Sequence, residues 1–445
     1  MELKVFIESL GCSKNLVDAE IMRGLLEKNK FQLTLEKEDA EIIIVNTCGF
    51  IESAKQESID TIIELGKYKI DGECKLLVVT GCLAERYNEE LLEALPEVDT
   101  IVGTGNFPEI ISIVKDNLEG KKVSKFGDID AEIEEDLPRI LSTPSYMSYL
   151  KIAEGCDNHC TYCIIPKLRG KYRSRKMEKI INEAKDMANK GIKEIIIIAQ
   201  DTTRYGIDLY NEYKLPELLK ELCKIEGIKW IRLLYCYPDK ITDELIDTMA
   251  SEEKICKYLD MPIQHCNNGI LKRMNRKTTK EHIISVIEKM RNKMPEIHLR
   301  TSLIVGFPGE TEEQFEELKD FVKDIKFDRL GVFAYSKEED TPAEKLPNQI
   351  DEEVKIKRQD EIMIMQKDIS FEKNKQKTGK IYDILIEEEL EDFVYIGRTT
   401  YDSPEIDGVV YVHTSKKIGI GEFVKVKITD ILEYDLIGEM LGESC

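Results

Sequence analysis

The segment that decides the fold is Cys156-Asp157-Asn158-His159-Cys160-Thr161-Tyr162-Cys163, which places three cysteines within eight residues. It follows residues 147–152, an apolar run with the composition of a buried strand. In α/β proteins, the loops after the carboxyl ends of the strands carry the active site. Three thiolates this close together can bind three irons of a four-iron cluster. The fourth iron then stays open for chemistry, like the open position of a catalytic metal.

Two other interpretations of this segment stay open. The three cysteines together with His159 could bind zinc, although no second C-x-x-C pair completes a zinc finger. Cys160 and Cys163 could instead form a redox dithiol. That interpretation leaves Cys156 without a role and needs a helix N-terminus directly after the pair, which the sequence does not predict.

A second set of cysteines is dispersed through the first 120 residues. Cys12, Cys48 and Cys82 each follow a predicted strand. Because the carboxyl ends of parallel strands share one edge of a sheet, we expect these thiols to converge. An adjoining glycine at each would let the backbone approach a bulky inorganic group closely; these are Gly11, Gly49 and Gly81. A second iron–sulfur site and three buried structural cysteines both fit this pattern.

The cysteine usage also bears on the cellular compartment. The chain has twelve cysteines, and its first residues lack the basic and apolar regions of a signal peptide. No run of about 18 apolar residues predicts a membrane span. We therefore expect a cytoplasmic protein that uses thiols for metal or redox chemistry rather than disulfides. The remaining cysteines are interpreted as core or surface thiols: Cys74, Cys223, Cys236, Cys256, Cys266 and Cys445.

The length of 445 residues predicts several domains. Residues 1–120 alternate strands and helices, which is typical of a parallel-sheet α/β domain. Residues 121–141 are polar and acidic, as expected of a linker. Six further strand–helix units in residues 142–373 predict a partial (β/α)6 barrel. Five short alternating strands in residues 374–445 predict a small antiparallel β-barrel.

The strands are predicted as follows. In the first domain they cover residues 4–8, 41–45, 76–80 and 100–102. In the second they cover residues 147–152, 194–198, 230–234, 257–260, 298–303 and 329–334. In the third they cover residues 381–387, 393–398, 409–413, 423–428 and 436–440.

These motifs carry a resemblance to a known family. The spacing Cys156-x-x-x-Cys160-x-x-Cys163 is the signature of the radical S-adenosylmethionine (SAM) superfamily. With SLGCSKN at 9–15, NTCGF at 46–50 and TGC at 80–82, the chain resembles the methylthiotransferases along essentially its whole length. Its further stretches are similar to the RimO branch, the ribosomal protein S twelve methylthiotransferases: SLGCSKNLVDAE at 9–20, IPKLRG at 165–170, AQDTT at 199–203 and SPEIDGVV at 403–410.

The resemblance implies an enzyme with two 4Fe–4S clusters, a radical SAM core and a C-terminal TRAM domain. One cluster would be held by Cys156, Cys160 and Cys163, and there SAM would yield a radical that abstracts hydrogen. The other would be held by Cys12, Cys48 and Cys82 and would carry the sulfur that is methylated. The implied target is the β-carbon of an aspartate, and the implied electron donor is a flavodoxin or ferredoxin. The alternatives are a transfer-RNA adenosine methylthiotransferase and a zinc-stabilised binding protein without catalysis.

Resemblance and topology together predict contacts to SAM at the strand ends. Gln200 and Asp201 would meet the methionyl amino group. Other polar or flexible positions follow later strands and would contact the rest of the cofactor: Gln264, His265, Ser302, Gly306, Gly309 and Glu310. The run 167–176 holds six cations in ten residues. It is either a solvated turn or a binding site in which Arg173 meets the cofactor carboxylate or an acidic substrate segment.

The charge of the chain favours a basic partner. Its formal net charge is −22, and residues 380–445 alone hold six Lys/Arg and fifteen Asp/Glu. Because phosphate binding needs positive contacts, we do not expect this C-terminal region to bind RNA directly. Its potential complements a basic ribosomal protein of the small subunit. A solvated acidic face without a partner is the alternative.

Overall fold

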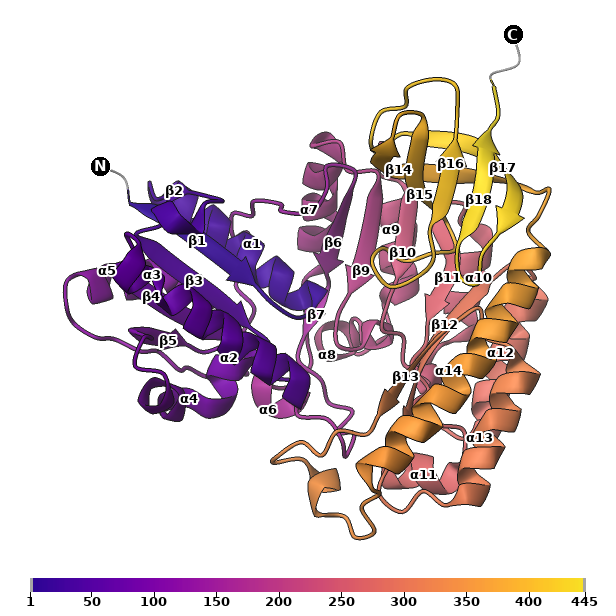
Figure 1. Ribbon diagram of the computed structural model, residues 1–445, viewed down its shortest axis with the longest axis horizontal. Helices are drawn as coiled ribbons and strands as arrows, with labels where there is room; N and C mark the ends of the chain where they lie inside the picture. The colour runs from indigo at the N-terminus through magenta and orange to yellow at the C-terminus, as the bar shows by residue number, and fades with distance from the viewer. Residues whose placement is uncertain (1–2, 443–445) are drawn as a thin grey trace.

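The computed structural model describes residues 3–442 and divides into three parts of different architecture (Figure 1). A parallel sheet with helices on both faces comes first, an open parallel barrel follows, and a small closed barrel ends the chain. Within the described residues, no helix is both long and apolar enough to cross a membrane. Cys445 lies outside the described residues.

The first part has five parallel strands in the order β2-β1-β3-β4-β5. The strands are β1 (Lys4–Ser9), β2 (Gln32–Leu33), β3 (Ile42–Thr47), β4 (Leu76–Gly81) and β5 (Thr100–Val102). The helices are α1 (Ser13–Lys28), α2 (Glu52–Gly66), α3 (Tyr68–Asp71), α4 (Cys82–Ala94) and α5 (Ile110–Leu118). Every residue of β3 and β4 is buried, as expected of central strands covered on both faces. The two-residue strand β2 was not predicted, because it is too short to show a pattern.

The second part is a six-stranded parallel sheet whose spatial order follows the sequence from β6 to β13. Its strands are β6 (Met147–Lys151), β9 (Glu194–Ile198), β10 (Trp230–Leu233), β11 (Ile255–Asp260), β12 (His298–Val305) and β13 (Arg329–Ala334). The covering helices are α7 (Met177–Asn189), α9 (Leu215–Cys223), α10 (Asp243–Ser251), α12 (Lys280–Lys293) and α13 (Glu312–Ile325). One large apolar core joins these helices to the sheet. The prediction of an open six-unit barrel is confirmed.

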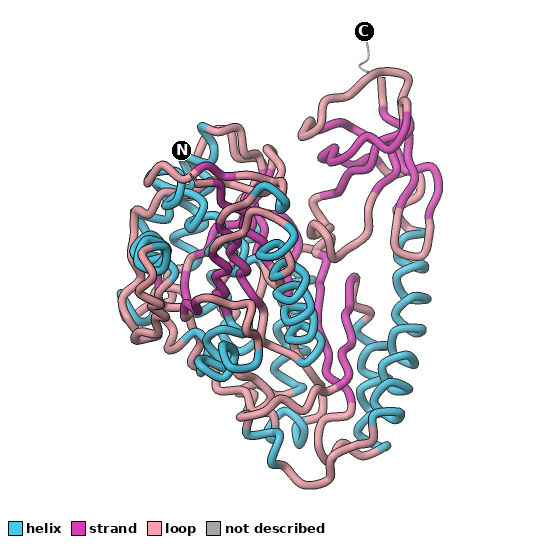
Figure 2. Tube along the Cα trace, turned by 60° about the vertical axis from the view of Figure 1, so that its left-hand side comes forward, coloured by secondary structure: helices cyan, strands magenta, loops and turns pink. Residues whose placement is uncertain are grey.

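Short elements in the loops of this part surround the functional residues. They are β7 (Ala153–Glu154), α6 (Ile165–Arg169), β8 (Arg173–Ser174), α8 (Ile207–Tyr210) and α11 (Asn268–Arg273). The long helix α14 (Glu352–Lys375) packs along β13 and leads to the third part (Figure 2).

The third part is a closed barrel in the order β14-β15-β16-β18-β17. Its strands are β14 (Ile381–Glu391), β15 (Val394–Thr399), β16 (Val410–His413), β17 (Phe423–Ile431) and β18 (Leu436–Met440). All pairs are antiparallel except β16 with β18, which is parallel. The expectation of a wholly antiparallel barrel therefore misses one pair, because β18 returns from β17 into the gap beside β16.

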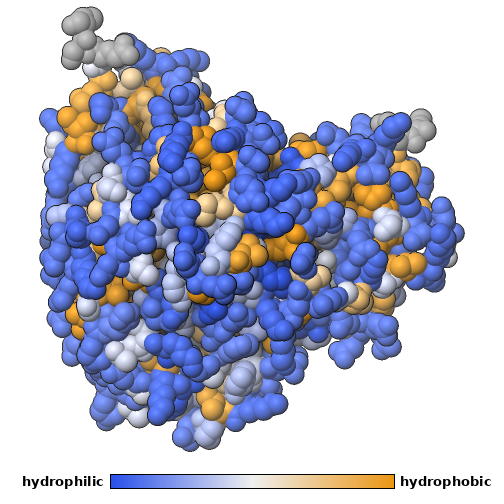
Figure 3. Space-filling model, turned by 180° about the vertical axis from the view of Figure 1, so that it is seen from behind, coloured by the Kyte–Doolittle hydropathy of each residue, from blue (hydrophilic) through white to orange (hydrophobic). Residues whose placement is uncertain are grey.

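Buried ion pairs fix the closed barrel to the amino ends of the parallel strands. Glu194 accepts from Arg232 at 2.8 Å and from Arg398 of the closed barrel at 2.6 Å. Arg329 binds Asp402 at 2.5 Å. Part of the acidity of the C-terminal region is thus neutralised inside the molecule. On the face shown in Figure 3, hydrophilic residues predominate and apolar ones lie in small groups.

Candidate functional site

The first cysteine triplet lies on the loop between β7 and α6. Gly155 begins this loop with φ +73°, and a Cβ there would come within 1.9 Å of the Lys171 carbonyl oxygen. Burial raises the pKa of the Cys156 thiol to about 12, and the backbone N–H of Asn158 points at its sulfur. The Cys163 thiol also has a raised pKa, caused by burial and by the neighbouring Cys160 and Cys156. The three thiols are therefore close neighbours.

Cys160 has two polar neighbours from other loops of the barrel. The Arg276 guanidinium donates to its sulfur at 3.9 Å, and the Tyr237 hydroxyl lies 3.8 Å from the same sulfur. Arg276 also stacks on the Tyr237 ring, 3.7 Å from its centroid. Helix α6 begins at Ile165, so a helix N-terminus does follow Cys163, contrary to the expectation used against a dithiol.

The second triplet comes from three different elements of the first part. Cys12 is the N-cap of α1, Cys48 follows β3, and Cys82 is the first residue of α4. Burial, together with the neighbouring Cys82 and Cys12, raises the pKa of Cys48 to about 11. Cys48 therefore has the other two thiols of this triplet among its neighbours. Helix N-termini at two of them favour thiolate charge.

The glycines beside this triplet serve close packing of the cysteine loops on one another. Gly11 has φ +86°, and a Cβ there would lie 2.6 Å from the Cys48 Cβ and 3.0 Å from its sulfur. A Cβ at Gly49 would lie 2.8 Å from the backbone of Leu83. These glycines are therefore needed because the cysteine loops pack closely against one another, and not only because an inorganic group would lie nearby.

Asn15 joins the loops of the second triplet. Its amide group donates to the carbonyl oxygens of Leu10 and Thr47 at 3.0 and 2.9 Å. Its Oδ1 accepts from the Cys82 thiol at 3.8 Å and from the Arg169 guanidinium at 2.5 Å. Burial raises the pKa of Cys82, while the Arg169 charge acts in the opposite direction.

The two triplets lie on adjoining surfaces of the first and second parts. The Cys82 side chain packs in one apolar cluster with Ile164, the residue after Cys163, and with Leu168 of α6. At the far end of the open barrel, Glu338 binds Arg86 at 3.0 Å and accepts the backbone N–H of Glu52 at 2.8 Å. The first part therefore contacts both the first and the last strand–loop unit of the barrel.

The thiols suit a multi-iron cluster better than one ion. Among the described residues, no three His, Cys, Asp or Glu side chains are placed to ligate a single metal ion. A four-iron cluster holds each thiolate on a different iron, so its ligands need not meet at one point. Backbone N–H groups of Phe50, Asn158 and Ile165 point at cysteine sulfurs, and such hydrogen bonds stabilise cluster thiolates.

Of the two SAM contacts predicted near β9, only Gln200 has a side-chain atom without a hydrogen-bond partner within the described residues. Gln200 donates to Glu154 at 2.6 Å, but its buried Oε1 has no partner within the described residues. That atom could accept an amino group, so Gln200 fits the predicted cofactor. Asp201 is fully buried, and its carboxylate accepts from Asn158 at 2.8 Å and from Thr203. Asp201 thus holds the loop of the first triplet, and its contact with SAM stays a prediction.

The contacts predicted farther along the barrel lie at the carboxyl end of β12. The Gln264 backbone N–H donates to Ser302 at 2.9 Å. Glu310 is fully engaged: it binds His265 at 3.1 Å and Arg358 at 2.8 Å, and accepts from the Gly306 backbone. Gly306, with φ +71°, faces the Lys355 side chain. These roles in binding SAM stay predictions.

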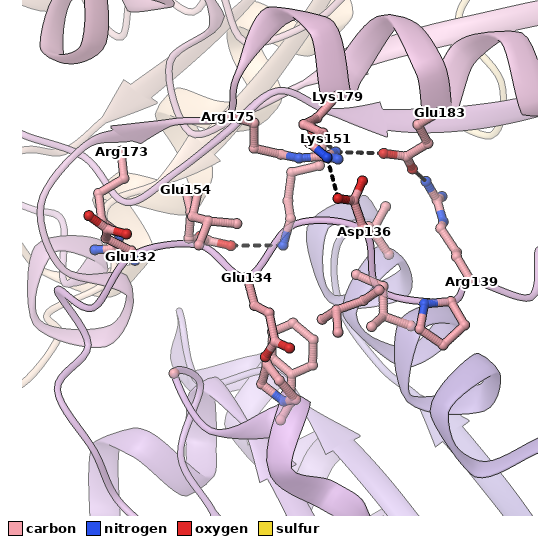
Figure 4. A pocket seen from close by; sticks show the side chains of 18 of the residues that line it. Glu132, Glu134, Asp136, Arg139, Lys151, Glu154, Arg173, Arg175, Lys179 and Glu183 are labelled. Atoms are coloured by element: carbon pink, nitrogen blue, oxygen red, sulfur yellow. Dashed lines mark hydrogen bonds and ion pairs between the residues drawn. The ribbon is translucent and has the colours of Figure 1, made fainter. Parts of the chain in front are cut away.

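The basic run after the first triplet is paired with acidic residues of the chain. Arg173 lies 3.6 Å from Asp130 of the linker, and Arg175 binds Glu135 at 3.1 Å. A cavity of about 560 Å³ lies between this run, the linker and α1 (Figure 4). Several of its charged lining residues are paired with one another, as Lys151 is with Glu154 at 2.9 Å. A role of Arg173 toward cofactor or substrate stays a prediction.

Sequence reasoning missed several residues that contact the thiols. Asn15 lies in the SLGCSKN motif and Arg169 in the IPKLRG motif, so both were part of quoted stretches without receiving a role. Tyr237 and Arg276 carried no local signal, because their loops reach Cys160 only in the folded barrel.

Comparison with known proteins agrees with this architecture. Residues 4–103 match the family model described as uncharacterized protein family UPF0004, residues 150–322 the radical SAM superfamily and residues 378–441 the TRAM domain. Two solved radical SAM enzymes share the fold. TsrM from Kitasatospora setae has a TM-score of 0.57 at 13% identity over 75% of this chain and 73% of its own. OxsB has a TM-score of 0.51 at 14% identity over 83% of this chain and 56% of its own.

Full-length relatives are far more similar in sequence. Ribosomal protein uS12 methylthiotransferase RimO of Clostridioides difficile (strain 630) is 60% identical over 441 residues, which is 99% of each chain. The protein of the same name from Lachnoclostridium phytofermentans is 53% identical over 98% of this chain and 99% of its own. The chain therefore belongs to the RimO family of radical SAM methylthiotransferases.

Proposed function

We propose that this chain replaces a hydrogen on the β-carbon of an aspartate of ribosomal protein uS12 with a methylthio group. The names of its full-length relatives support the reaction and the protein substrate. The observation that carries the finer proposal is the packing of Cys82 against Ile164 and Leu168, next to Cys163. This contact supports an arrangement in which the two groups of three thiols lie side by side.

We further propose the ligands of two clusters. Cys156, Cys160 and Cys163 hold the cluster that binds SAM, and Cys12, Cys48 and Cys82 hold a second 4Fe–4S cluster. When bound, these groups supply the substrate radical and the sulfur that it takes up. The chain itself supplies the geometry: Gly155 and Asp201 shape one ligand loop, and Asn15 ties together the loops of the other triplet.

The cofactor contacts follow from the polar groups that remain free. Gln200 Oε1 accepts from the methionyl amino group of SAM, because it is a buried acceptor that lacks a partner within the described residues. Ser302 and Gln264 lie at the same rim of the sheet and contact the adenosine. Asp201, Gly306, Glu310 and Arg173 complete the proposed cofactor-binding set.

The closed barrel is proposed to dock the basic substrate. Asp402 and Asp407 are buried against core arginines, so they are not available to a partner. The end of β14 and the turn that follows it carry four exposed acids: Glu388, Glu389, Glu391 and Asp392. A flavodoxin or ferredoxin donates electrons, and the protein works in the cytoplasm. The proposed domains are 1–120, the linker 121–141, 142–373 and 374–445.

A direct assay tests this function. The anaerobically reconstituted protein is incubated with SAM, sulfide and a low-potential reductant, together with either 30S subunits or transfer RNA. We expect mass spectrometry to find a methylthio group on one aspartate of uS12. A methylthio group on transfer-RNA adenosine, with uS12 unmodified, would overturn the proposal. About eight irons per chain are expected from two four-iron clusters.

A further inference from the structure

Arg169 is a charged residue of the second part that lies next to the second triplet. It ends α6, six residues after Cys163, and its side chain is only 3% exposed. Its Nη1 binds Asp18 of α1 at 2.6 Å and lies 3.4 Å from Glu154. Its Nη2 donates to Asn15 Oδ1 at 2.5 Å. The guanidinium therefore spans the boundary between the first and second parts.

The hydrogen bond to Asn15 connects Arg169 to the loops of all three cysteines. The same amide oxygen lies 3.8 Å from the Cys82 sulfur, while the Asn15 amide nitrogen donates to the carbonyl oxygens of Leu10 and Thr47, the residues just before the Gly11–Cys12 and Cys48 positions. Asn15, in the first part, therefore holds the loops of the triplet together. Arg169, in the second part, holds the Asn15 amide in its orientation.

The ion pairs around Arg169 also determine the net charge beside the second triplet. Arg169 and Lys151 face Asp18 and Glu154, so the buried group is formally balanced without the thiols. Within this group Arg169 is the cation whose partner, Asn15, also lies against a cysteine of the triplet.

We propose that Arg169 is a positioning residue for the second cluster, which it orients through Asn15 and whose reduction potential it raises. The inference rests on the proposed function, because it requires that this triplet holds a cluster. A cation beside a cluster stabilises the reduced form, which carries one more negative charge. The Glu154 carboxylate that binds Arg169 also accepts from Gln200, so the same hydrogen-bonded series reaches the proposed SAM site.

The test isolates the second cluster in the full-length chain. Cys156, Cys160 and Cys163 are replaced by alanine, so that only the second triplet can bind a cluster. The first measurement is iron content with Arg169 intact. About four irons per chain are expected, and their absence would refute the second cluster itself rather than the role of Arg169.

The second measurement is a redox titration followed by electron paramagnetic resonance. In this background, Arg169→Gln should make the reduced form at least tenfold less populated at a given potential, which is a shift of about 59 mV for one electron. Arg175→Gln is the matched control, because Arg175 is also buried but is paired with Glu135 and Glu183. Arg169→Lys keeps the charge and should shift the potential less than Arg169→Gln.

The outcomes separate charge from folding. An unchanged midpoint potential in Arg169→Gln, at full iron occupancy, overturns the proposal. Iron loss in Arg169→Gln with normal occupancy in Arg169→Lys supports it, since the charge alone then restores the site. Iron loss in both variants, with Arg175→Gln normal, assigns Arg169 to folding of the interface and also overturns the proposal.

Discussion

The two cysteine triplets differ in how the chain brings them together. Cys156, Cys160 and Cys163 lie on one loop, so their proximity is local and follows from a short spacing. Cys12, Cys48 and Cys82 meet only because three parallel strands end at the same edge of a sheet. The first site depends on one loop conformation, whereas the second depends on the whole first part and on its contact with the barrel.

Despite this difference, each triplet receives a buried arginine from a distant segment. Arg276 reaches Cys160 across the barrel, and Arg169 reaches the Cys82 region across the boundary between the two parts. A cluster with three thiolates carries negative charge, and a nearby cation lowers the cost of burying it. The dispersed triplet should therefore be the more sensitive to changes made far from its ligands.

The largest expected effect is the loss of one cluster at a time. Cys82→Ser and Cys160→Ser should each abolish methylthiolation and remove about four irons per chain. Only Cys160→Ser should also abolish reductive cleavage of SAM to 5′-deoxyadenosine. Iron analysis and chromatography of the cleavage product measure both. Cys74→Ser, at a buried cysteine outside both triplets, should keep all the iron. Retention of SAM cleavage in Cys160→Ser would reverse the assignment of the two sites.

A methyl group at Gly11 should remove the second cluster selectively. Its Cβ would press on the Cys48 side chain, and the left-handed backbone adds strain on the order of 1–3 kcal/mol. Gly11→Ala should therefore lose close to half of the iron while it still cleaves SAM. Gly120→Ala is the matched control, because Gly120 has a similar φ of +84° but open space around it. Normal iron content in Gly11→Ala would show that the cysteine loops can move apart without cost.

Breaking the contact at the far end of the barrel should misplace the second triplet without removing it. Glu338→Ala leaves Arg86 without its buried partner and frees the Glu52 backbone N–H, close to Cys48. Misplacement by about 1 Å can reduce a rate ~100-fold, so methylthiolation should fall by about that factor while SAM cleavage continues. Glu339→Ala, which removes an exposed neighbour, should have little effect. Equal losses of both activities in Glu338→Ala would argue against separate roles for the triplets.

The sequence could predict the fold and the shared sheet edge of Cys12, Cys48 and Cys82 for clear physical reasons. Apolar runs alternating with amphipathic helices predict parallel sheets, and the ends of β1, β3 and β4 then have to share an edge. The limits of β9, β13 and β18 match the predicted ones residue for residue. The two-residue strand β2 was missed because it has no periodicity to detect.

The contacts around the thiols could not be predicted in the same way. The partners that Asp201 and Glu310 have within the chain were not predicted: Asn158 donates to Asp201, and Arg358 binds Glu310. The run 167–176 was expected to be either a solvated turn or a binding site, and its contacts with Asp130, Glu135 and Asp18 were not predicted. Such pairings depend on segments distant in sequence, and a local motif does not encode them.

The smallest predicted effect concerns the tyrosine beside the contiguous triplet. The Tyr237 hydroxyl lies 3.8 Å from the Cys160 sulfur, and a hydrogen bond to a ligand sulfur favours the reduced cluster. Tyr237→Phe keeps the ring that stacks on Arg276, so the cation should stay in place. With Cys12, Cys48 and Cys82 replaced by alanine, the midpoint of the remaining cluster should fall by less than about 59 mV. Tyr235→Phe, whose ring instead packs under the Lys14 ammonium, should leave it unchanged. A shift in midpoint potential as large as the one expected for Arg169→Gln would contradict this prediction. The Tyr237 hydroxyl would then affect the cluster of the local loop as strongly as the buried Arg169 charge affects the cluster of the dispersed triplet. The proposed difference between the two sites would not hold.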